Sequence, residues 1–138
     1  MLTSRLTTLT ALAALALAPA GQAQQLGTAD KRPVMLIGGE EGVDPCALAR
    51  IHDPATGEEA GSILVFAGPT TEFEVIDTLG DGDPVWVCDL SDDMLGIVYS
   101  HDPDRDCEVS SPLDADRPYG GPCASGWVKA DWVEMLAG

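Results

Sequence analysis

The side chains that could carry chemistry in this chain are two histidines and four cysteines. A cysteine hydrolase needs a thiolate held beside a histidine, and the histidines are His52 and His101. Disulfide formation is the competing use of the thiols, because an even number of cysteines in a small exported chain is typical of a disulfide framework. We favour that use for all of them, Cys46, Cys88, Cys107 and Cys123. We therefore predict that the protein is not an enzyme, has no catalytic residue and uses no cofactor.

An acidic run follows the second histidine and begins like a calcium-binding loop. Residues 102–106 read Asp-Pro-Asp-Arg-Asp, which resembles the start of the twelve-residue calcium loop. The sixth position, which needs glycine, is Cys107, and the twelfth, which needs glutamate, is Leu113. The strict motif fails, so we assign no metal ligand, and weak calcium binding stays open beside a simply solvated loop. A zinc site on His101 and the cysteines lacks closely spaced ligand pairs and needs reduced thiols.

The first 23 residues have the order of a secretory signal peptide. A single basic residue, Arg5, precedes an apolar run over residues 9–18 and small residues that end at Ala23. Cleavage is predicted after Ala23, with Ala20 as the alternative. The run is shorter than the ~20 apolar residues that span a bilayer, which disfavours a retained membrane anchor. We expect an exported protein, periplasmic or extracellular, without a membrane span after cleavage.

Four cysteines allow three disulfide pairings. We favour Cys107–Cys123, because this bond closes a stretch that has little apolar content of its own. The other bond is then Cys46–Cys88, which ties the N-terminal segment to the centre of the chain. Both bonds suit an oxidising compartment and a small core that gains stability from cross-links.

The chain is strongly acidic. It carries 7 basic and 23 acidic residues, and without residues 1–23 it has six basic and 23 acidic ones, a formal charge of −17. Such a surface repels nucleic acid and anionic lipid, so neither is expected as a partner. Two explanations stay open: solubility or a salty habitat on one side, and attraction to a basic partner or to cations on the other.

Residues 84–100 predict a central β-hairpin. Val, Ile, Trp and Tyr fill two apolar runs on either side of a polar corner at 91–93, and no stretch has helical apolar spacing. Within the second run Gly96 marks a bend or a bulge. The 115 residues that follow position 23 suffice for one domain.

Shorter strands are predicted at 46–51, 62–66 and 72–79, the last with Phe73 and Val75 on one face. The closing segment is expected to form a strand pair about a tight turn at 129–131, with a helix as the alternative. The predicted organisation is a signal peptide at 1–23, a leader and extension at 24–45, flexible over 24–33, and one domain at 46–138. Residues 34–37 are apolar and either tuck against the barrel or form an exposed patch. Residues 101–125 form a long loop held by its cross-link.

Residues 63–136 resemble a bacterial SH3 (SH3b) domain. Residues 64–73, LVFAGPTTEF, are similar to the family segment V-R-x-G-P-G-T-x-Y/F, and residues 75–79, 82–87 and 126–133 follow in the family's order. The resemblance implies an all-β, SH3-like barrel of five to six short strands, here with an N-terminal extension and a long disulfide-closed loop. It also implies a non-catalytic module that binds cell-wall peptides or proteins. Phe66 replaces the family's usual arginine, and Thr70 its second turn glycine.

Aromatic side chains are the predicted ligand-binding groups. Trp127 and Val128 are expected in the core, whereas an aromatic platform suits an extended peptide from the cell wall or from an exported protein partner. We predict that platform from Phe66, Phe73, Trp86 and Tyr119. The alternative is a structural or accessory domain of a larger exported complex with no small ligand, which an exposed apolar patch at 34–37 would favour.

Overall fold

The computed structural model describes residues 31–53 and 61–137, so the predicted signal peptide and most of the predicted leader lie outside the described residues. The described part is nearly all β, as predicted, with a single short 3-10 turn. Nine strands are present rather than five to six, in part because two of them have only two residues. The strands are β1 Met35–Leu36, β2 Ala47–Ile51, β3 Ile63–Phe66, β4 Val75–Leu79, β5 Pro84–Ser91, β6 Met94–Tyr99, β7 Arg117–Pro118, β8 Ala124–Lys129 and β9 Val133–Ala137.

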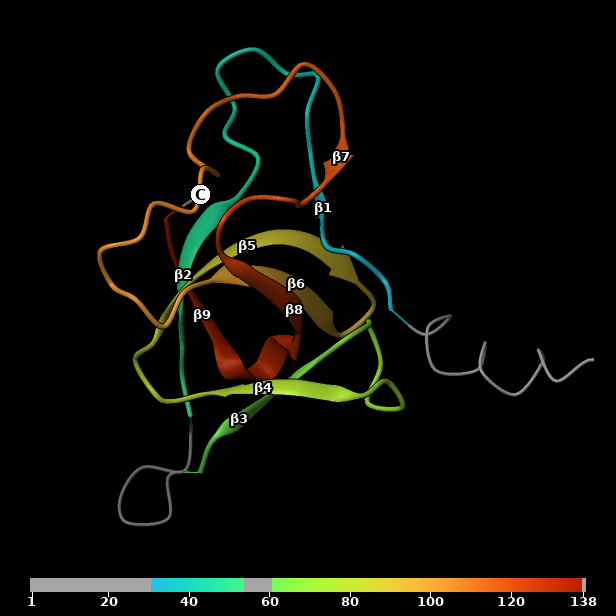
Figure 1. Cartoon of the computed structure of the whole chain (residues 1–138), viewed down its shortest axis with the longest axis vertical. Coiled ribbons are helices and arrows are strands. Elements are labelled where there is room, and N and C mark those ends of the chain that lie inside the picture. The colour runs from blue at the N-terminus through green and yellow to red at the C-terminus, as the bar shows by residue number, and fades with distance from the viewer. Residues whose placement is uncertain (1–30, 54–60, 138) are drawn as a thin grey trace, which may run out of the picture.

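Seven strands form one antiparallel sheet in the order β4-β3-β8-β6-β5-β2-β9, and β1 pairs with β7 in a second, two-stranded sheet. The large sheet curls strongly around itself (Figure 1). Its edge strands β4 and β9 have no hydrogen-bonded ladder between them in the described part of the chain, so the sheet is not a closed barrel.

The predicted central hairpin is confirmed as β5 and β6, joined by a turn at Asp92 and Asp93. Strand β6 is the fourth of the seven and is apolar on both faces. Val98 belongs to one core cluster, and the neighbouring residues Ile97 and Tyr99 belong to the other. Apolar side chains on both faces therefore mark β6 as a central strand, with a core packed against each of its faces.

The predicted irregularity at Gly96 lies on the opposite strand. Val87 pairs with Ile97 and Asp89 with Gly96, so Cys88 is the unpaired, bulged residue. Gly96 has a different task. A Cβ there would lie 2.7 Å from Asp89 Cβ and 3.1 Å from Val34 Cγ1, so only glycine lets the N-terminal segment approach β6 this closely.

The two faces of the sheet carry separate apolar cores. One cluster includes Ile51, Val65 and Val85, with Tyr99 and Val128. The other cluster lies between the sheet and residues 31–45 and 101–123, which we call the cap; β1, β7 and the loops beside them lie at the top of Figure 1, and an orange loop of the cap lies at the left. The second core forms only because the cap covers the sheet.

The prediction that Phe73 and Val75 share one face of a strand was wrong. The strand begins only at Val75, and its register against β3 skips Ile76. Val75 is 45% exposed, whereas Leu79, of the same expected face, is buried, so the bulge at Ile76 breaks the expected alternation. Phe73 lies in the preceding turn and packs over Gly68, where a Cβ would come within 2.3 Å of the phenyl ring.

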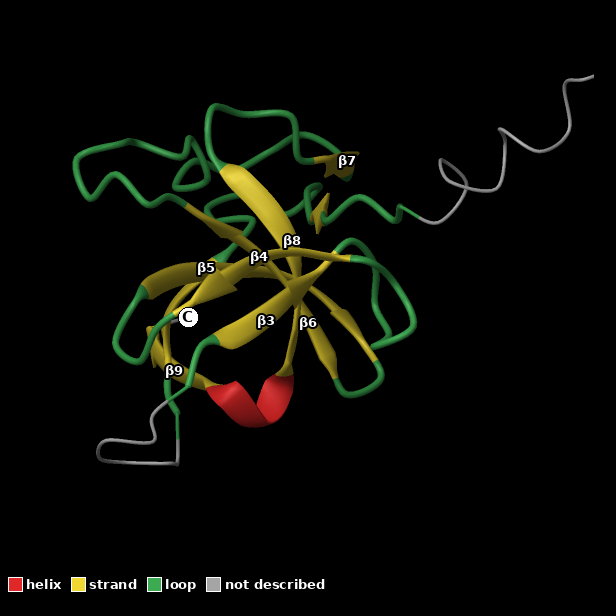
Figure 2. Cartoon of the chain, turned by 60° about the horizontal axis from the view of Figure 1, so that its bottom comes forward, coloured by secondary structure: helices red, strands yellow, loops and turns green. Residues whose placement is uncertain are grey.

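The predicted tight turn at 129–131 is a 3-10 turn, Ala130–Trp132, drawn in red in Figure 2. The strands on its two sides do not pair with each other, contrary to the prediction. Strand β8 pairs with β6 and β3, and β9 pairs with β2. The turn thus carries the chain from the middle of the sheet to one edge.

The apolar segment at 34–37 is tucked against the sheet. Val34 and Leu36 are 1% and 2% exposed, and only Ile37 points into solvent. The packing begins inside the region predicted to be a flexible leader, because Trp127 Nε1–H donates to the Arg32 carbonyl at 2.9 Å. The Arg32 guanidinium also lies 5.2 Å from the Trp127 ring centroid. The continuous exposed patch that would favour an accessory domain is therefore not formed at these positions.

Candidate functional site

Both predicted disulfides are confirmed. Cys46 is bonded to Cys88, and Cys107 to Cys123. No free cysteine remains in the described part of the chain, so the thiol that a cysteine hydrolase needs is missing from the arrangement. The first bond joins the end of the cap to the bulge of β5. The second lies within residues 101–123 of the cap, which we call the cap loop.

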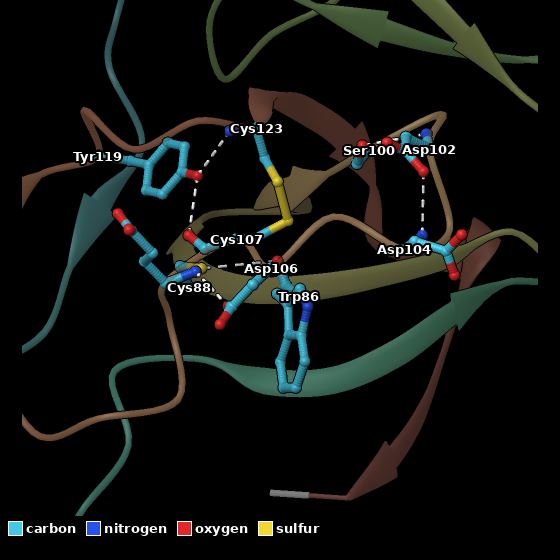
Figure 3. Close-up of a disulfide and its surroundings, with 10 residues drawn as sticks. Trp86, Cys88, Ser100, Asp102, Asp104, Asp106, Cys107, Tyr119 and Cys123 are labelled. Atoms are coloured by element: carbon cyan, nitrogen blue, oxygen red, sulfur yellow. Dashed lines mark hydrogen bonds between the residues drawn. A yellow bond between two sulfur atoms is a disulfide. The ribbon is translucent and has the colours of Figure 1, made fainter.

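Tyr119 holds the cap loop together beside its disulfide. Its hydroxyl donates to the Cys107 carbonyl at 2.9 Å and accepts from the Cys123 N–H at 3.0 Å (Figure 3). Burial raises the pKa of Tyr119, and the negative charges of Glu108 and Asp106 act in the same direction. The phenol is therefore uncharged, and its two hydrogen bonds link the ends of the loop.

The aspartates of the acidic run at 102–106 accept hydrogen bonds from backbone N–H groups of the same loop. Asp102 Oδ1 accepts the Asp104 N–H at 3.0 Å, and Asp106 Oδ1 accepts the Glu108 N–H at 2.8 Å. Such turns are the usual local role of aspartate in loops. Within residues 31–53 and 61–137 no three His, Cys, Asp or Glu side chains are grouped so that they could hold a metal ion.

The largest of four grooves, about 930 Å³, lies where β2, β5 and β9 meet the cap. Trp86 and Leu48 face each other across β5 and β2 and belong to its lining. Leu90 and Met135 also line it and are 66% and 51% exposed. We call this hollow the Trp86 groove. Its lining combines large apolar side chains that folding leaves in contact with water, which is characteristic of binding surfaces.

The four predicted aromatic residues do not share one groove. Phe66 is largely buried and lines a second groove of about 490 Å³. Tyr119 lines a third of about 290 Å³, and Phe73 packs against the core beneath the β3–β4 turn. Only Trp86 lies in the largest groove. All four belong to or pack against the core cluster under the cap, so they share a core rather than a binding surface.

Most groove residues were not predicted, among them Val43, Leu90 and Met135. Leu90 carried a usable signal, because a large apolar side chain directly before the polar corner at 91–93 is out of place on a solvated hairpin end. Nothing in the local sequence around Val43 or Met135 indicates that they line a groove. They reach the groove only through the disulfide and through the pairing of β9 with β2.

A polar cluster joins β4 to the end of β6. Asp77 Oδ2 accepts the Tyr99 hydroxyl at 2.8 Å and lies 2.7 Å from His101 Nε2. The Tyr99 and His101 rings meet edge to face. Burial acts to raise the pKa of Asp77, but the hydrogen bonds from His101, Tyr99 and the Thr78 N–H outweigh it and lower that pKa. Burial and the Asp77 carboxylate raise the pKa of Tyr99.

Asp77→Ala is expected to lower the free energy of unfolding by about 1–3 kcal/mol, because the buried Tyr99 hydroxyl loses its acceptor. Tyr99→Phe removes that hydroxyl, so Asp77→Ala should cost less in the Tyr99→Phe background. Urea unfolding of the four proteins at neutral pH measures the cycle. Equal costs of Asp77→Ala in both backgrounds would contradict the assigned contact.

The same carboxylate makes stability depend on pH. Because its pKa in the folded protein lies below the ordinary 3.8, ionised Asp77 favours folding at neutral pH. That contribution is lost as the pH falls below about 4 through the lowered pKa. The stability difference between the wild type and Asp77→Asn should therefore shrink between roughly pH 5 and pH 2, as measured by urea unfolding. A difference that grows with acid would contradict this sign.

The Trp86 groove is thus the site whose geometry best suits a ligand. It is the largest of the four grooves, it is lined mainly by apolar side chains, and a cross-linked cap forms one of its walls. No helix in the described residues is long and apolar enough to cross a membrane. Comparison of the chain with protein-family models, with curated proteins and with solved structures finds no match.

Proposed function

We propose that the chain is an exported, non-catalytic, SH3b-like module that binds an extended peptide, from the cell wall or from a partner protein, in the Trp86 groove. The observation that carries the proposal is the groove itself. It has a half-buried tryptophan in its lining and exposed apolar side chains around it, Ile37, Val43, Leu90 and Met135. Binding sites for peptides combine such an apolar surface with a rigid scaffold.

The strand arrangement supports an SH3-like barrel. Strands β4, β3, β8, β6 and β5 are consecutive neighbours in the bent sheet and lie within residues 63–136, and five is a number of strands that the resemblance implies. The Gly-Trp-Val segment at 126–128 lies in β8. A Cβ on Gly126 would come within 2.4 Å of Val65 Cγ1, so glycine is needed where β8 packs closely on β3.

Export is supported by two independent features. The chain begins with the residue order of a signal peptide. Its four cysteines form two disulfides, which persist in oxidising compartments outside the cytosol.

An extended ligand is favoured by the strand that borders the groove. Strand β9 is an edge strand: in the described chain it pairs with β2 on one side only. Its residues Met135 and Ala137 line the groove. A peptide that added itself to β9 would gain main-chain hydrogen bonds from the free edge, and its side chains would contact the part of the lining that β9 supplies.

Leu90→Asp is expected to reduce peptide affinity at least roughly tenfold, because it places a charge at the centre of an apolar contact. Leu90 is 66% exposed, so the fold should tolerate the change. The matched control is Leu64→Asp, which alters an exposed leucine that lines the second groove instead.

The measurement is NMR chemical-shift titration of the oxidised protein with soluble muropeptides and with short extended peptides. We expect shifts in the Trp86 indole and along β9, lost in Leu90→Asp and kept in Leu64→Asp. Shifts that instead surround Phe66 and Leu64 would move the site to the second groove. If no probe causes shifts, peptide binding is wrong and an accessory role takes its place.

A further inference from the structure

We infer that the segment bound in the Trp86 groove is cationic, an extended polypeptide that combines apolar side chains with lysine or arginine. This inference rests on the proposed function and names the chemical class of its partner. It is based on the charged side chains around the groove, which are a feature separate from the apolar lining.

The cap wall beside the groove is acidic. Asp44 lines the groove itself, and Glu40 and Glu41 line a smaller hollow of about 250 Å³ that adjoins the groove at Gly42. Asp114 lies on the far side of that hollow. All four carboxylates are exposed, and in the described chain the side-chain ion pairs involve other acidic residues, Asp77, Asp81 and Glu134.

The wall is held in place before any ligand arrives. The Gly38 N–H donates to Asp116 Oδ1 at 2.7 Å, and the Gly39 N–H donates to the Leu113 carbonyl at 2.8 Å. The Cys46–Cys88 disulfide fixes the other end of the segment. Carboxylates on an anchored backbone lose little conformational freedom when a cation binds, which makes their attraction more effective.

No basic side chain lines either hollow. Two of the described cations are engaged elsewhere: Arg50 pairs with Glu134 at 2.7 Å, and Arg32 lies over the Trp127 ring. The six basic and 23 acidic residues that follow position 23 give the protein a net negative field. Such a field steers cationic partners toward the surface and disfavours anionic ones.

Because of the geometry of an extended strand, one ligand can contact both the apolar lining and the acidic wall. Successive side chains of an extended strand point to opposite faces. An extended peptide lying along the groove would therefore place one set of side chains on Trp86 and Leu90. Lysine and arginine have long apolar stems with a charged end, so the other set can reach Asp44 and the glutamates beyond it.

Three nine-residue peptides with identical apolar positions test the inference, with lysine, glutamine or glutamate at the alternating positions. Affinity for the oxidised protein is measured by chemical-shift titration at low salt and at roughly 0.5 M salt. The lysine peptide should bind roughly tenfold more tightly than the glutamine peptide at low salt, and the glutamate peptide should bind weakest. Salt should reduce these differences, because it screens exposed charges.

Charge-matched variants locate the effect. Glu40→Gln with Glu41→Gln should weaken the lysine peptide roughly threefold to tenfold and leave the glutamine peptide unchanged. Glu72→Gln with Glu74→Gln removes the same charge near the β3–β4 turn and should change either affinity less than about twofold.

The outcomes separate the two claims. If the glutamine peptide binds as tightly as the lysine peptide, the groove remains a peptide site and the cationic partner is wrong. If both double variants weaken the lysine peptide equally, the acidic wall is not the contact and the inference is also overturned. If none of the three peptides binds at either salt concentration, the proposed function itself fails.

Discussion

Replacing Cys46 and Cys88 together with alanine is expected to lower the free energy of unfolding by about 4 kcal/mol. The bond links residues 42 positions apart, so its loss restores much conformational freedom to the unfolded chain. It also frees the end of the cap that forms one wall of the Trp86 groove, since both cysteines line that groove. Peptide binding should therefore weaken even under conditions where the variant stays folded.

The second disulfide is the matched control. Cys107→Ala with Cys123→Ala opens a loop of only 16 positions and should cost about 3 kcal/mol. Tyr119 still hydrogen-bonds to both ends of that loop, so the groove should keep its shape. Urea unfolding under non-reducing conditions and peptide titration measure both pairs. A larger loss of peptide affinity in the control pair would contradict the placement of the site.

Trp127→Ala is expected to lower the free energy of unfolding by about 3–5 kcal/mol, the range for deleting a buried tryptophan side chain. The Trp127 side chain is fully buried and links three parts of the molecule. It packs in the core under the cap, touches the Gly96 site of β6 and hydrogen-bonds to the Arg32 carbonyl.

The cap should loosen before the sheet does in this variant. Amide hydrogen exchange reports it, because the Tyr119 N–H donates to the Val34 carbonyl and the Met35 N–H to Asp89 Oδ2. Both amides should lose protection, while β5 and β6 keep theirs. Trp127→Phe keeps most of the apolar volume and should cost only about 1–3 kcal/mol. Equal costs for the two variants, or unchanged protection of the cap amides, would refute this account of the residue.

A cationic partner also gives the acidity of the chain a direct meaning. Charge alone left both solubility and partner attraction open. The structure places carboxylates without a basic neighbour beside an apolar groove, which favours the second alternative at this site. The acidic run at 102–106 fits the first, because Asp102 and Asp106 serve their own turns.

Local patterns predicted the features that depend on neighbouring residues. The apolar alternation on both faces of residues 94–99 identified the strand that lies at the centre of the sheet. The cysteine pairing followed from chain position and compartment, and both bonds are present. The predicted orientation of the Val75 side chain was wrong, because it depends on a bulge at Ile76. A bulge forms only against a particular partner strand.

The candidate site could be predicted only in part for the same reason. Trp86 was identified by residue type, but its neighbours Val43, Leu48 and Met135 are distant in sequence and meet only in the folded sheet. By itself the sequence determined an all-β, disulfide-linked and strongly acidic chain, since residue type and short-range periodicity suffice for these properties. Only the tertiary structure decided that residues 34 and 36 join the core and that β9 lies beside β2. Strand order and groove shape depend on contacts between distant segments, which no local pattern specifies.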